Sequence, residues 1–385
     1  MASMIKIGVP SLLLLSCLAQ AAEEPRPPLA RLLEPGPHAV GYRVWHRHDS
    51  SRPFGQAAER PVQISIWYPA ESAADGERLT LEAYLGSAAT EIDFDLVDER
   101  SQRRAVERVR ALALAGGSDA TRFDQAAARE TGAVRERKPR GGSFPLILFA
   151  PGQGGPAFQA VALSEHLASH GYVVAAIPSV GKSSREIESE PEGLEANVGD
   201  LELALGEMRK FPGADGDRVG VIGYSFGGMA ATLLAMGHPE VAAVVALDPG
   251  FRVAGNQEIW RGSPRFDPAR LRQPMLVLLA RGVGGPPDLS FLDGLGSSDV
   301  QLLGFPDLRH GDFASVIVEL FLHTQADGGG RDPHRVDLGH ATACRYARSF
   351  LDAHLKGDGE ARAFLTASPA AHGIPAGVVT LEERR

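Results

Sequence analysis

From residue 144 onward, short apolar segments alternate with stretches of helical periodicity. The apolar segments cover 144–152, 171–178, 218–225, 241–248, 274–282 and 300–307. Helix-compatible stretches separate most of them, at 156–170, about 193–211 and 226–237, and a closing helix is expected at about 336–356. Continuous hydrophobicity, in place of apolar–polar alternation, indicates strands that are covered on both faces. The pattern therefore predicts the α/β class, with a mostly parallel central sheet flanked by crossover helices.

The region before residue 144 has a different pattern. Residues 40–49 and 60–70 alternate apolar and polar side chains, which predicts half-buried antiparallel strands. Residues 71–140 are rich in alanine and charge and have helical spacing, so we expect a helical insertion there. Two roles are open for this insertion: a cap over a pocket, or a cover for an edge of the sheet. Residues 22–385 are expected to form one domain that includes the insertion.

The first residues have the features of an export signal. Lys6 precedes a short apolar run, and the small-residue motif Ala-Gln-Ala ends at residue 21, so residues 1–21 are predicted to be a secretory signal peptide. The run is too short to span a bilayer, and no stable membrane span is expected. A periplasmic or secreted location follows, and lipid anchoring through Cys17 is the alternative.

Charge and cysteine content narrow the possible partners. The net charge is −9 at pH 7 and no basic block occurs, so a nucleic-acid partner is not expected. The chain has two cysteines, Cys17 and Cys344, and removal of the signal peptide leaves Cys344 without an internal partner. Cys344 lies in the closing helical pattern and is expected to be a small core residue. The sequence leaves the oligomeric state open.

The segment RVGVIGYSFGGMAATLLAM places Ser225 where an apolar strand turns into an apolar helix. Gly223 and Gly227 flank the serine, which gives the pattern Gly-x-Ser-x-Gly in a strand–turn–helix context. The glycines let strand and helix approach closely, and the strained turn lifts the hydroxyl out of the sheet. The alternative is a tight turn with an incidental serine, but the flanking strand and helix favour a nucleophile.

A nucleophilic serine needs a general base, which in this arrangement follows the acid along the chain. Five histidines stand in plausible places: His310, His323, His334, His340 and His354. His310 comes directly after the last expected strand, in the polar turn RHGDF, so we predict His310 as the base. His354 lies inside the closing helix, and the other three flank or occupy the glycine-rich stretch QADGGGRDPHRVDLG.

The acid that orients the histidine has more than one candidate. Asp248 directly follows the unbroken apolar segment at 241–248, so its side chain should emerge at the same sheet edge as Ser225. Asp288 and Asp293 follow the next strand, beyond the kinked segment GVGGPP. Asp248 also starts an Asp-Pro-Gly turn, which is a structural reason for an aspartate there. We select Asp248 and keep Asp288 and Asp293 as alternatives.

Two backbone N–H groups are expected to form an oxyanion hole. One belongs to Phe226, directly after the serine, and the other to Gln153, in the glycine-rich loop after the strand at 144–152. A phosphate-binding loop is excluded because no Lys-Ser pair follows the glycines. His46 and His48 share one face of a strand, but no third metal ligand is evident. We therefore expect no cofactor and no metal.

With these residues in place, the chain resembles the α/β-hydrolase superfamily, and within it the platelet-activating-factor acetylhydrolase and dienelactone-hydrolase-like serine hydrolases. The resemblance rests on ISIWYP, FPLILFAPGQGG, ASHGYVVAAIP, RVGVIGYSFGGMAA, ALDPG, RHGDF and ARSFLDAHLKGD, in this order between about residues 40 and 357. It implies an α/β-hydrolase fold and hydrolysis of a small-molecule carboxylic ester by Ser225, His310 and Asp248. Dienelactone hydrolases use a cysteine nucleophile, so that activity is not implied.

Other functions remain open at this stage. The fold also occurs in proteins that bind ligands without catalysis, although such relatives usually lose a triad member and this chain has candidates for all three. Acyl transfer to an acceptor other than water would use the same residues. The natural substrate and its acyl chain length are not specified by the sequence, beyond the expectation of small or medium acyl groups.

Overall fold

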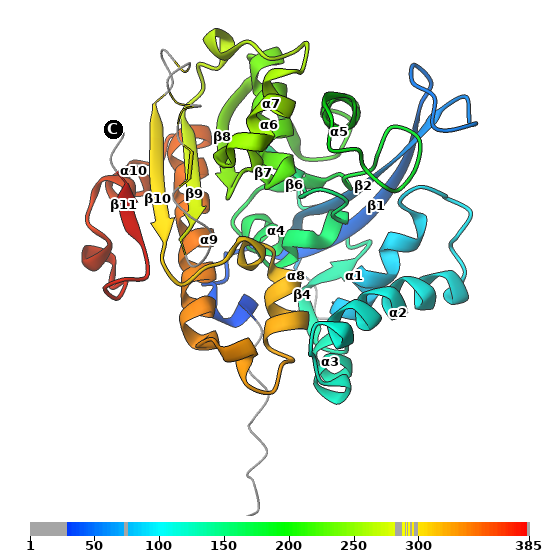
Figure 1. Cartoon of the computed structure of the whole chain (residues 1–385), viewed down its shortest axis with the longest axis horizontal. Coiled ribbons are helices and arrows are strands. Elements are labelled where there is room, and N and C mark those ends of the chain that lie inside the picture. Colours follow the sequence, from blue (N-terminus) through cyan, green and yellow to red (C-terminus); the bar gives the residue numbers. More distant parts are fainter. Residues whose placement is uncertain are drawn as a thin grey trace, which may run out of the picture.

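A single mixed sheet runs through the centre of the molecule, with helices on both faces (Figure 1). This computed structural model describes residues 29–72, 76–281, 287–288, 290, 292, 295 and 299–382. The described strands lie in the order β11-β10-β9-β8-β7-β5-β6-β2-β1-β4-β3. Their bounds are β1 (Ala39–Asp49), β2 (Arg60–Ala70), β3 (Arg78–Thr80), β4 (Glu130–Arg135), β5 (Phe144–Ala150), β6 (Val173–Ala176), β7 (Ala214–Tyr224), β8 (Val241–Leu247), β9 (Met275–Ala280), β10 (Val300–Phe305) and β11 (Thr380–Glu382).

Most helices connect successive strands or cover the sheet. Their bounds are α1 (Leu81–Ser87), α2 (Glu99–Ala115), α3 (Ala120–Ala127), α4 (Val161–Ser169), α5 (Pro191–Met208), α6 (Phe226–Gly237), α7 (Ala254–Arg261), α8 (Ser315–Ile317), α9 (Pro333–Leu355) and α10 (Gly359–Thr366). Short helical turns used below are η1 (Leu29–Leu32), η2 (Ala88–Thr90), η3 (Ala157–Ala160), η7 (His310–Phe313) and the π-helical turn η8 (Val318–Leu322).

The predicted parallel sheet is confirmed. All six apolar segments of the sequence form strands, β5 to β10, and the pairs β5–β6, β5–β7, β7–β8, β8–β9 and β9–β10 are parallel. The early strands β1 and β2 pair antiparallel, as their alternating pattern predicts, and β2 joins the sheet antiparallel to β6. Because parallel strands end at the same edge, side chains that follow β5, β7, β8 and β10 can meet there.

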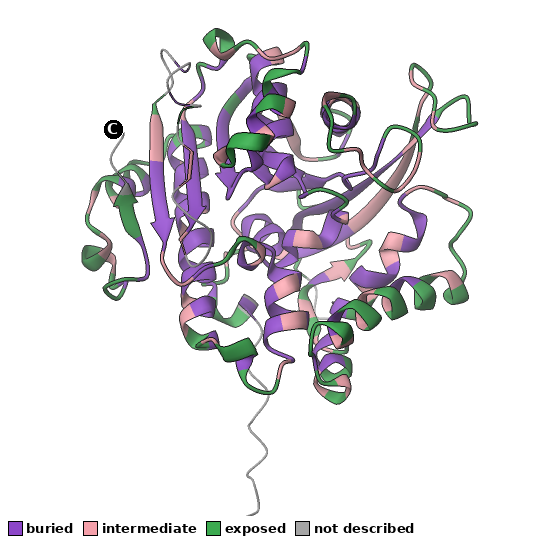
Figure 2. Ribbon diagram, in the orientation of Figure 1, coloured by how far each residue is buried: buried purple, intermediate pink, exposed green. Residues whose placement is uncertain are grey.

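The strands at the centre of the sheet are buried (Figure 2), and their side chains pack into two separate cores, one on each face of the sheet. On β5, Ile147 and Phe149 pack with α4, α9 and the insertion, while Leu146 and Leu148 pack with α5, α6 and α7. Successive strand residues point to opposite faces, and both faces are covered. The absence of apolar–polar alternation in the sequence therefore follows directly from the two-sided packing.

The insertion at 71–140 is not only helical. Besides α1, α2 and α3 it contains β3 and β4, and β4 pairs parallel with β1 through Val40 and Ala133. The sequence of β4, ETGAVR, has no strand-like alternation, so pairing with the free edge of β1 decides its structure. The insertion thus extends the sheet beyond β1, as expected of an edge cover.

The remaining expectations concern the ends of the chain. The predicted signal peptide and Cys17 lie outside the described residues. Within the described part of the chain, no helix combines the length and hydropathy needed to cross a bilayer. Cys344 is buried in α9, and burial raises the pKa of its thiol to about 12, in keeping with the expected packing role.

Candidate active site

Ser225 occupies a sharp turn between β7 and α6. Its backbone angles are φ 54° and ψ −120°, a strained region for a residue with a side chain. Three backbone hydrogen bonds hold this conformation: the Ser225 N–H donates to the Leu247 carbonyl at 3.0 Å, and the Ser225 carbonyl accepts the N–H groups of Gly228 at 2.9 Å and Gly250 at 2.7 Å. The turn directs the Ser225 hydroxyl away from the sheet edge, where it meets His310.

His310 follows β10 and begins the short turn η7. The Ser225 hydroxyl lies 2.8 Å from His310 Nε2, and His310 Nδ1 lies 2.6 Å from Asp248 Oδ2. An ionised carboxylate only accepts hydrogen bonds, so the Nδ1 position carries the proton and Nε2 is free to accept the serine proton. Ser225, His310 and Asp248, called the triad below, are therefore joined in one chain of hydrogen bonds.

Asp248 is fully buried at the end of β8, with a positive φ of 40°. Its second carboxylate oxygen accepts the Ala280 N–H at 2.8 Å and pairs with Arg252 Nε at 2.9 Å. A buried carboxylate is costly unless it has such partners. The two donors bind Oδ1, so Oδ2 stays available to His310.

The loop that carries His310 is held from two sides. The Tyr224 hydroxyl donates to the His310 carbonyl at 3.0 Å, and the two rings stack with their centroids 5.1 Å apart. On the other side, the Arg309 N–H donates to Asp312 at 2.6 Å, and Arg331 pairs with the same carboxylate. Packing and charge pairing thus fix the position of the imidazole.

Sequence reasoning missed Arg252, Tyr224 and Arg331 as supporting residues. Arg252 stands four residues after Asp248, a spacing that brings side chains together in a helical turn. Tyr224 is the residue before the serine, in a motif position that accepts any side chain. Arg331 is 19 positions from Asp312, and nothing in the sequence connects the two.

The other sequence candidates lie elsewhere. Asp288 accepts the Ser290 N–H at 2.9 Å, and no described contact links it to His310. Asp293 lies outside the described residues. The remaining histidines have other partners or places: His323 pairs with Asp337 at 2.6 Å, the buried His340 donates from Nδ1 to the Asp312 carbonyl at 2.7 Å, His354 packs on Phe350, and His334 is exposed.

The loop between β5 and η3 lies against the serine. A Cβ atom added to Gly152 would lie 3.3 Å from the Ser225 Cβ, so only glycine lets this loop approach so closely. Gln153 is the next residue and is exposed, and Phe226 begins α6, where an N–H has no acceptor within the helix. The use of the Gln153 and Phe226 N–H groups as oxyanion donors stays a prediction.

The possible metal pair has a packing role in the structure. The rings of His46 and His48 lie against Phe94 from the insertion, with centroids 4.3 Å and 5.0 Å away. Across the described residues, no three His, Cys, Asp or Glu side chains are grouped so that they could hold a metal ion.

A cavity of about 800 Å³ lies between the β1–β2 hairpin, α5 and the segment after α7. No triad residue lines it. Several of its charged side chains are paired with each other, such as Arg265 with Glu195 at 2.6 Å and with Glu202 at 2.5 Å. We therefore separate this cavity from the site around Ser225.

Comparison with known proteins gives matches of different extent. The chain is similar to dipeptidyl-peptidase 5 of Porphyromonas gingivalis, with 32% identity over 133 aligned residues; the match covers 30% of this chain and only 19% of that protein. Its structure is similar to a ferulic acid esterase from Streptomyces cinnamoneus, with a TM-score of 0.64, 21% identity, and coverage of 93% of this chain and 99% of the other. At this identity the structural match shows the shared fold.

The broadest match is to a family. The sequence profile described as "Alpha/beta hydrolase family" matches residues 147–377, more than half of the chain and the part that contains Ser225, Asp248 and His310. The sheet order, the turn at Ser225 and this match agree. The chain belongs to the alpha/beta hydrolase family.

Proposed function

We propose that this protein is an exported serine hydrolase that cleaves carboxylic esters with small or medium acyl groups. The observation that carries the proposal is the unbroken chain of hydrogen bonds from Ser225 through His310 to the buried Asp248. The strained backbone at Ser225 supports it, because such strain concentrates at functional sites.

The proposed reaction has two similar halves. His310 Nε2 takes the Ser225 proton while Oγ attacks the ester carbonyl carbon, and the resulting oxyanion binds the N–H groups of Phe226 and Gln153. The tetrahedral intermediate expels the alcohol, which receives the proton from His310, and an acyl-enzyme remains. Water then repeats the attack with His310 as base and releases the acid. Asp248 remains ionised and stabilises the imidazolium in both halves.

The position of the acid supports an acetylhydrolase-like enzyme. In this proposal Asp248, directly after β8, orients His310, in contrast to an acid after β9. Ser225 at the nucleophile position argues against a cysteine-dependent dienelactone hydrolase. The names of the two matching proteins point to ester and to peptide bonds. We favour esters because the alkoxide of an ester leaves a tetrahedral intermediate more readily than an amide nitrogen, which has to be protonated before it can leave.

Replacing Ser225 by alanine tests the nucleophile. In a serine hydrolase this change lowers turnover by about 10⁶-fold, so Ser225→Ala should neither react with a fluorophosphonate probe nor cleave p-nitrophenyl esters. Ser349→Ala, a change of a buried serine in α9, is the matched control and should keep both activities. Substantial ester cleavage by a folded Ser225→Ala protein would contradict the proposal. If the wild type cleaves dipeptidyl p-nitroanilides but no ester, the enzyme is a peptidase.

The proposal of export rests on the sequence of the first residues. If residues 1–21 are removed, mass spectrometry of the mature protein should find Ala22 at the N-terminus. A lipid-modified Cys17 at the N-terminus would instead show an anchored enzyme. Each outcome is read from the same peptide digest.

A further inference from the structure

The loop that would supply one oxyanion donor, residues 151–156, is called the oxyanion loop here. Two local hydrogen bonds shape it: the Gly155 N–H donates to the Gly152 carbonyl at 2.8 Å, and the Gly152 N–H donates to Gln159 Oε1 at 2.7 Å. These bonds fold the loop tightly, but they do not tie it to the rest of the molecule. Its position relative to Ser225 depends on contacts from other segments.

Glu91 of the insertion makes one of these contacts. Its side chain is fully buried, and Glu91 Oε1 accepts the N–H of Ala157 at 3.0 Å. Ala157 is the first residue of η3 and directly follows the oxyanion loop. The other carboxylate oxygen pairs with the guanidinium of Arg185. The carboxylate therefore joins the end of the oxyanion loop to a second loop.

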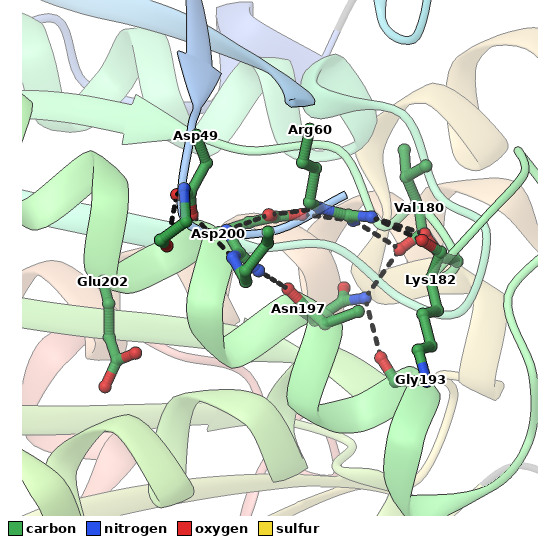
Figure 3. Close-up of polar contacts among 12 residues, drawn as sticks. Asp49, Arg60, Val180, Lys182, Gly193, Asn197, Asp200 and Glu202 are labelled. Carbon is green, nitrogen blue, oxygen red and sulfur yellow. Dashed lines mark hydrogen bonds and ion pairs between the residues drawn. The ribbon is translucent and has the colours of Figure 1, made fainter. Parts of the chain in front are cut away.

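That second loop, residues 177–190 between β6 and α5, is itself anchored at its start. The buried Arg60 donates to both oxygens of Asp200 at 2.6 Å and to the carbonyls of Val180 at 3.0 Å and Gly181 at 2.7 Å, as Figure 3 shows for Arg60, Asp200 and Val180. Asn197 donates to the Val180 carbonyl from α5 at 3.2 Å. These hydrogen bonds hold Val180 and Gly181 in place, and so hold the start of the loop that carries Arg185.

The same loop touches the oxyanion loop at two further points. The Ser179 N–H donates to the Gly155 carbonyl at 2.9 Å, and the Gln153 side-chain amide donates to Ser189 Oγ at 2.6 Å. Together with the Arg185–Glu91 pair, these contacts connect the oxyanion loop to residues 177–190 at several positions. One of these positions is Gln153, the residue whose N–H is the predicted donor.

Burying the Glu91 carboxylate has a cost. Burial raises its pKa, and Arg185, the Ala157 N–H and Arg108 of α2 act in the opposite direction. A buried charge held by two partners contributes little net stability compared with an apolar residue, although removing one partner is costly. A role in geometry accounts for the carboxylate better than a role in stability.

We propose that Glu91 is a positioning residue for the oxyanion hole, so that the insertion supplies part of the active-site architecture. Glu91 acts by fixing the Ala157 N–H and, through it, the position of the Gln153 N–H relative to Ser225. The inference rests on the proposed ester hydrolysis.

A double-mutant cycle between Glu91 and Ala157 tests the proposal. Glu91→Ala removes the acceptor. Ala157→Pro removes the donor from the first position of η3, where the extended Pro156 before it accommodates proline. Loss of one oxyanion donor costs about 10²–10³-fold in kcat, so a displaced donor should cost about 10- to 100-fold. The substrate is p-nitrophenyl acetate.

Three results are expected. Each single variant lowers kcat by this factor with KM within about threefold, and weakens a trifluoromethyl ketone inhibitor equally, because its hemiketal oxyanion needs the same donors. The double variant should show no larger loss of kcat than either single variant, because both substitutions remove the same hydrogen bond between Ala157 and Glu91. The matched control is Glu165→Ala, which removes another buried carboxylate that accepts an N–H of the insertion, from Gly132 at 2.7 Å, and should keep kcat within threefold.

The proposal is overturned if either single variant keeps kcat within threefold of the wild type, or if the double variant loses the product of the two single effects. If Glu91→Ala does not fold, as judged by circular dichroism, Ala157→Pro alone decides the outcome. A wild type that cleaves no ester would instead overturn the proposed function, so the two failures are distinguishable.

Discussion

Backbone strain marks two of the three triad residues. Among the described non-glycine residues, only Glu136, Ser225 and Asp248 have positive φ angles. Each such residue costs about 1–3 kcal/mol and persists only where its surroundings fix it. Asp248 is fixed by its N–H, which donates to the Leu278 carbonyl at 2.7 Å, and Ser225 by three backbone bonds. The strain turns both side chains toward His310.

A change at Asp248 separates the two positions proposed for the acid. In Asp248→Asn the amide oxygen should stay with the Ala280 N–H and Arg252, which leaves the NH₂ group facing His310 Nδ1. His310 would then carry its proton on Nε2 and could not act as base, at a cost of about 10⁴-fold in turnover. Asp288→Asn is the matched control and should retain wild-type turnover on the same ester. The reverse result would place the acid after β9.

The three residues that the hydrogen bonds join could be selected from the sequence because Ser225 and Asp248 directly follow apolar strands and His310 comes five residues after the end of another. Their supporting residues could not be. Arg252 pairs with Asp248 and Tyr224 bonds to His310, and these contacts form only in the folded chain. Local sequence shows which residues end strands, whereas the pairing of side chains depends on how distant strands align.

At the scale of elements, the junction of β7 and α6 leaves no room for a side chain at Gly227. A Cβ atom there would lie 2.1 Å from the Ala150 carbonyl oxygen and 2.4 Å from that of Pro151, both backbone atoms that cannot move independently. Strand β5, helix α6 and the start of the oxyanion loop meet at this point. Gly227 is therefore required because β5, α6 and the oxyanion loop all approach each other closely at this position.

Replacing Gly227 by alanine should therefore destabilise the protein and impair turnover together. Overpacking of this kind typically costs about 1–3 kcal/mol, and the displaced backbone carries Gly152 and Gln153. Gly237→Ala, at the last residue of the same helix, meets no atom within 4 Å and should leave both properties nearly unchanged. Urea denaturation and p-nitrophenyl acetate turnover measure the two effects. Wild-type stability in Gly227→Ala would show that β5 and α6 separate more easily than the structure indicates.

The elements differ in how well the sequence predicts them. Strands β5 to β10 are apolar throughout, so burial on both faces dictates their structure wherever they pair. Strands β3 and β4 are short and polar, and they form because β1 offers a free edge. The sequence of the insertion therefore predicts only helices, because a helix forms from neighbouring residues, whereas β3 and β4 need pairing partners that the local sequence does not contain.

At the scale of the whole molecule, Glu319 joins three distant parts of the chain. It lies in η8, buried, where its carboxylate accepts the Leu29 backbone N–H of η1 and faces Arg129 of the insertion. Glu165 and Asp337 add negative charge nearby. Burial is the largest effect, and it raises the pKa of Glu319 to about 7.

This raised pKa predicts a pH-dependent stability. The ordinary value for the carboxyl is 4.5, so between pH 4.5 and about 7 the folded state binds more protons than the unfolded state. Stability from Glu319 is then fully present below pH 4.5 and is lost as pH rises through about 7, by on the order of 3 kcal/mol.

Glu319→Gln isolates this contribution, because glutamine has the shape of the protonated acid and does not ionise. The variant and the wild type should have similar free energies of unfolding at about pH 4, and the variant should be more stable by on the order of 3 kcal/mol at about pH 8.5. Buried histidines with lowered pKa values, such as His340, contribute the opposite slope, but equally to both proteins, so they cancel in the difference. Urea denaturation at several pH values measures this difference. A difference that stays constant across the range would mean that the Glu319 carboxyl ionises at its ordinary pKa in the folded chain, and that the junction of η1, η8 and the insertion is open to water.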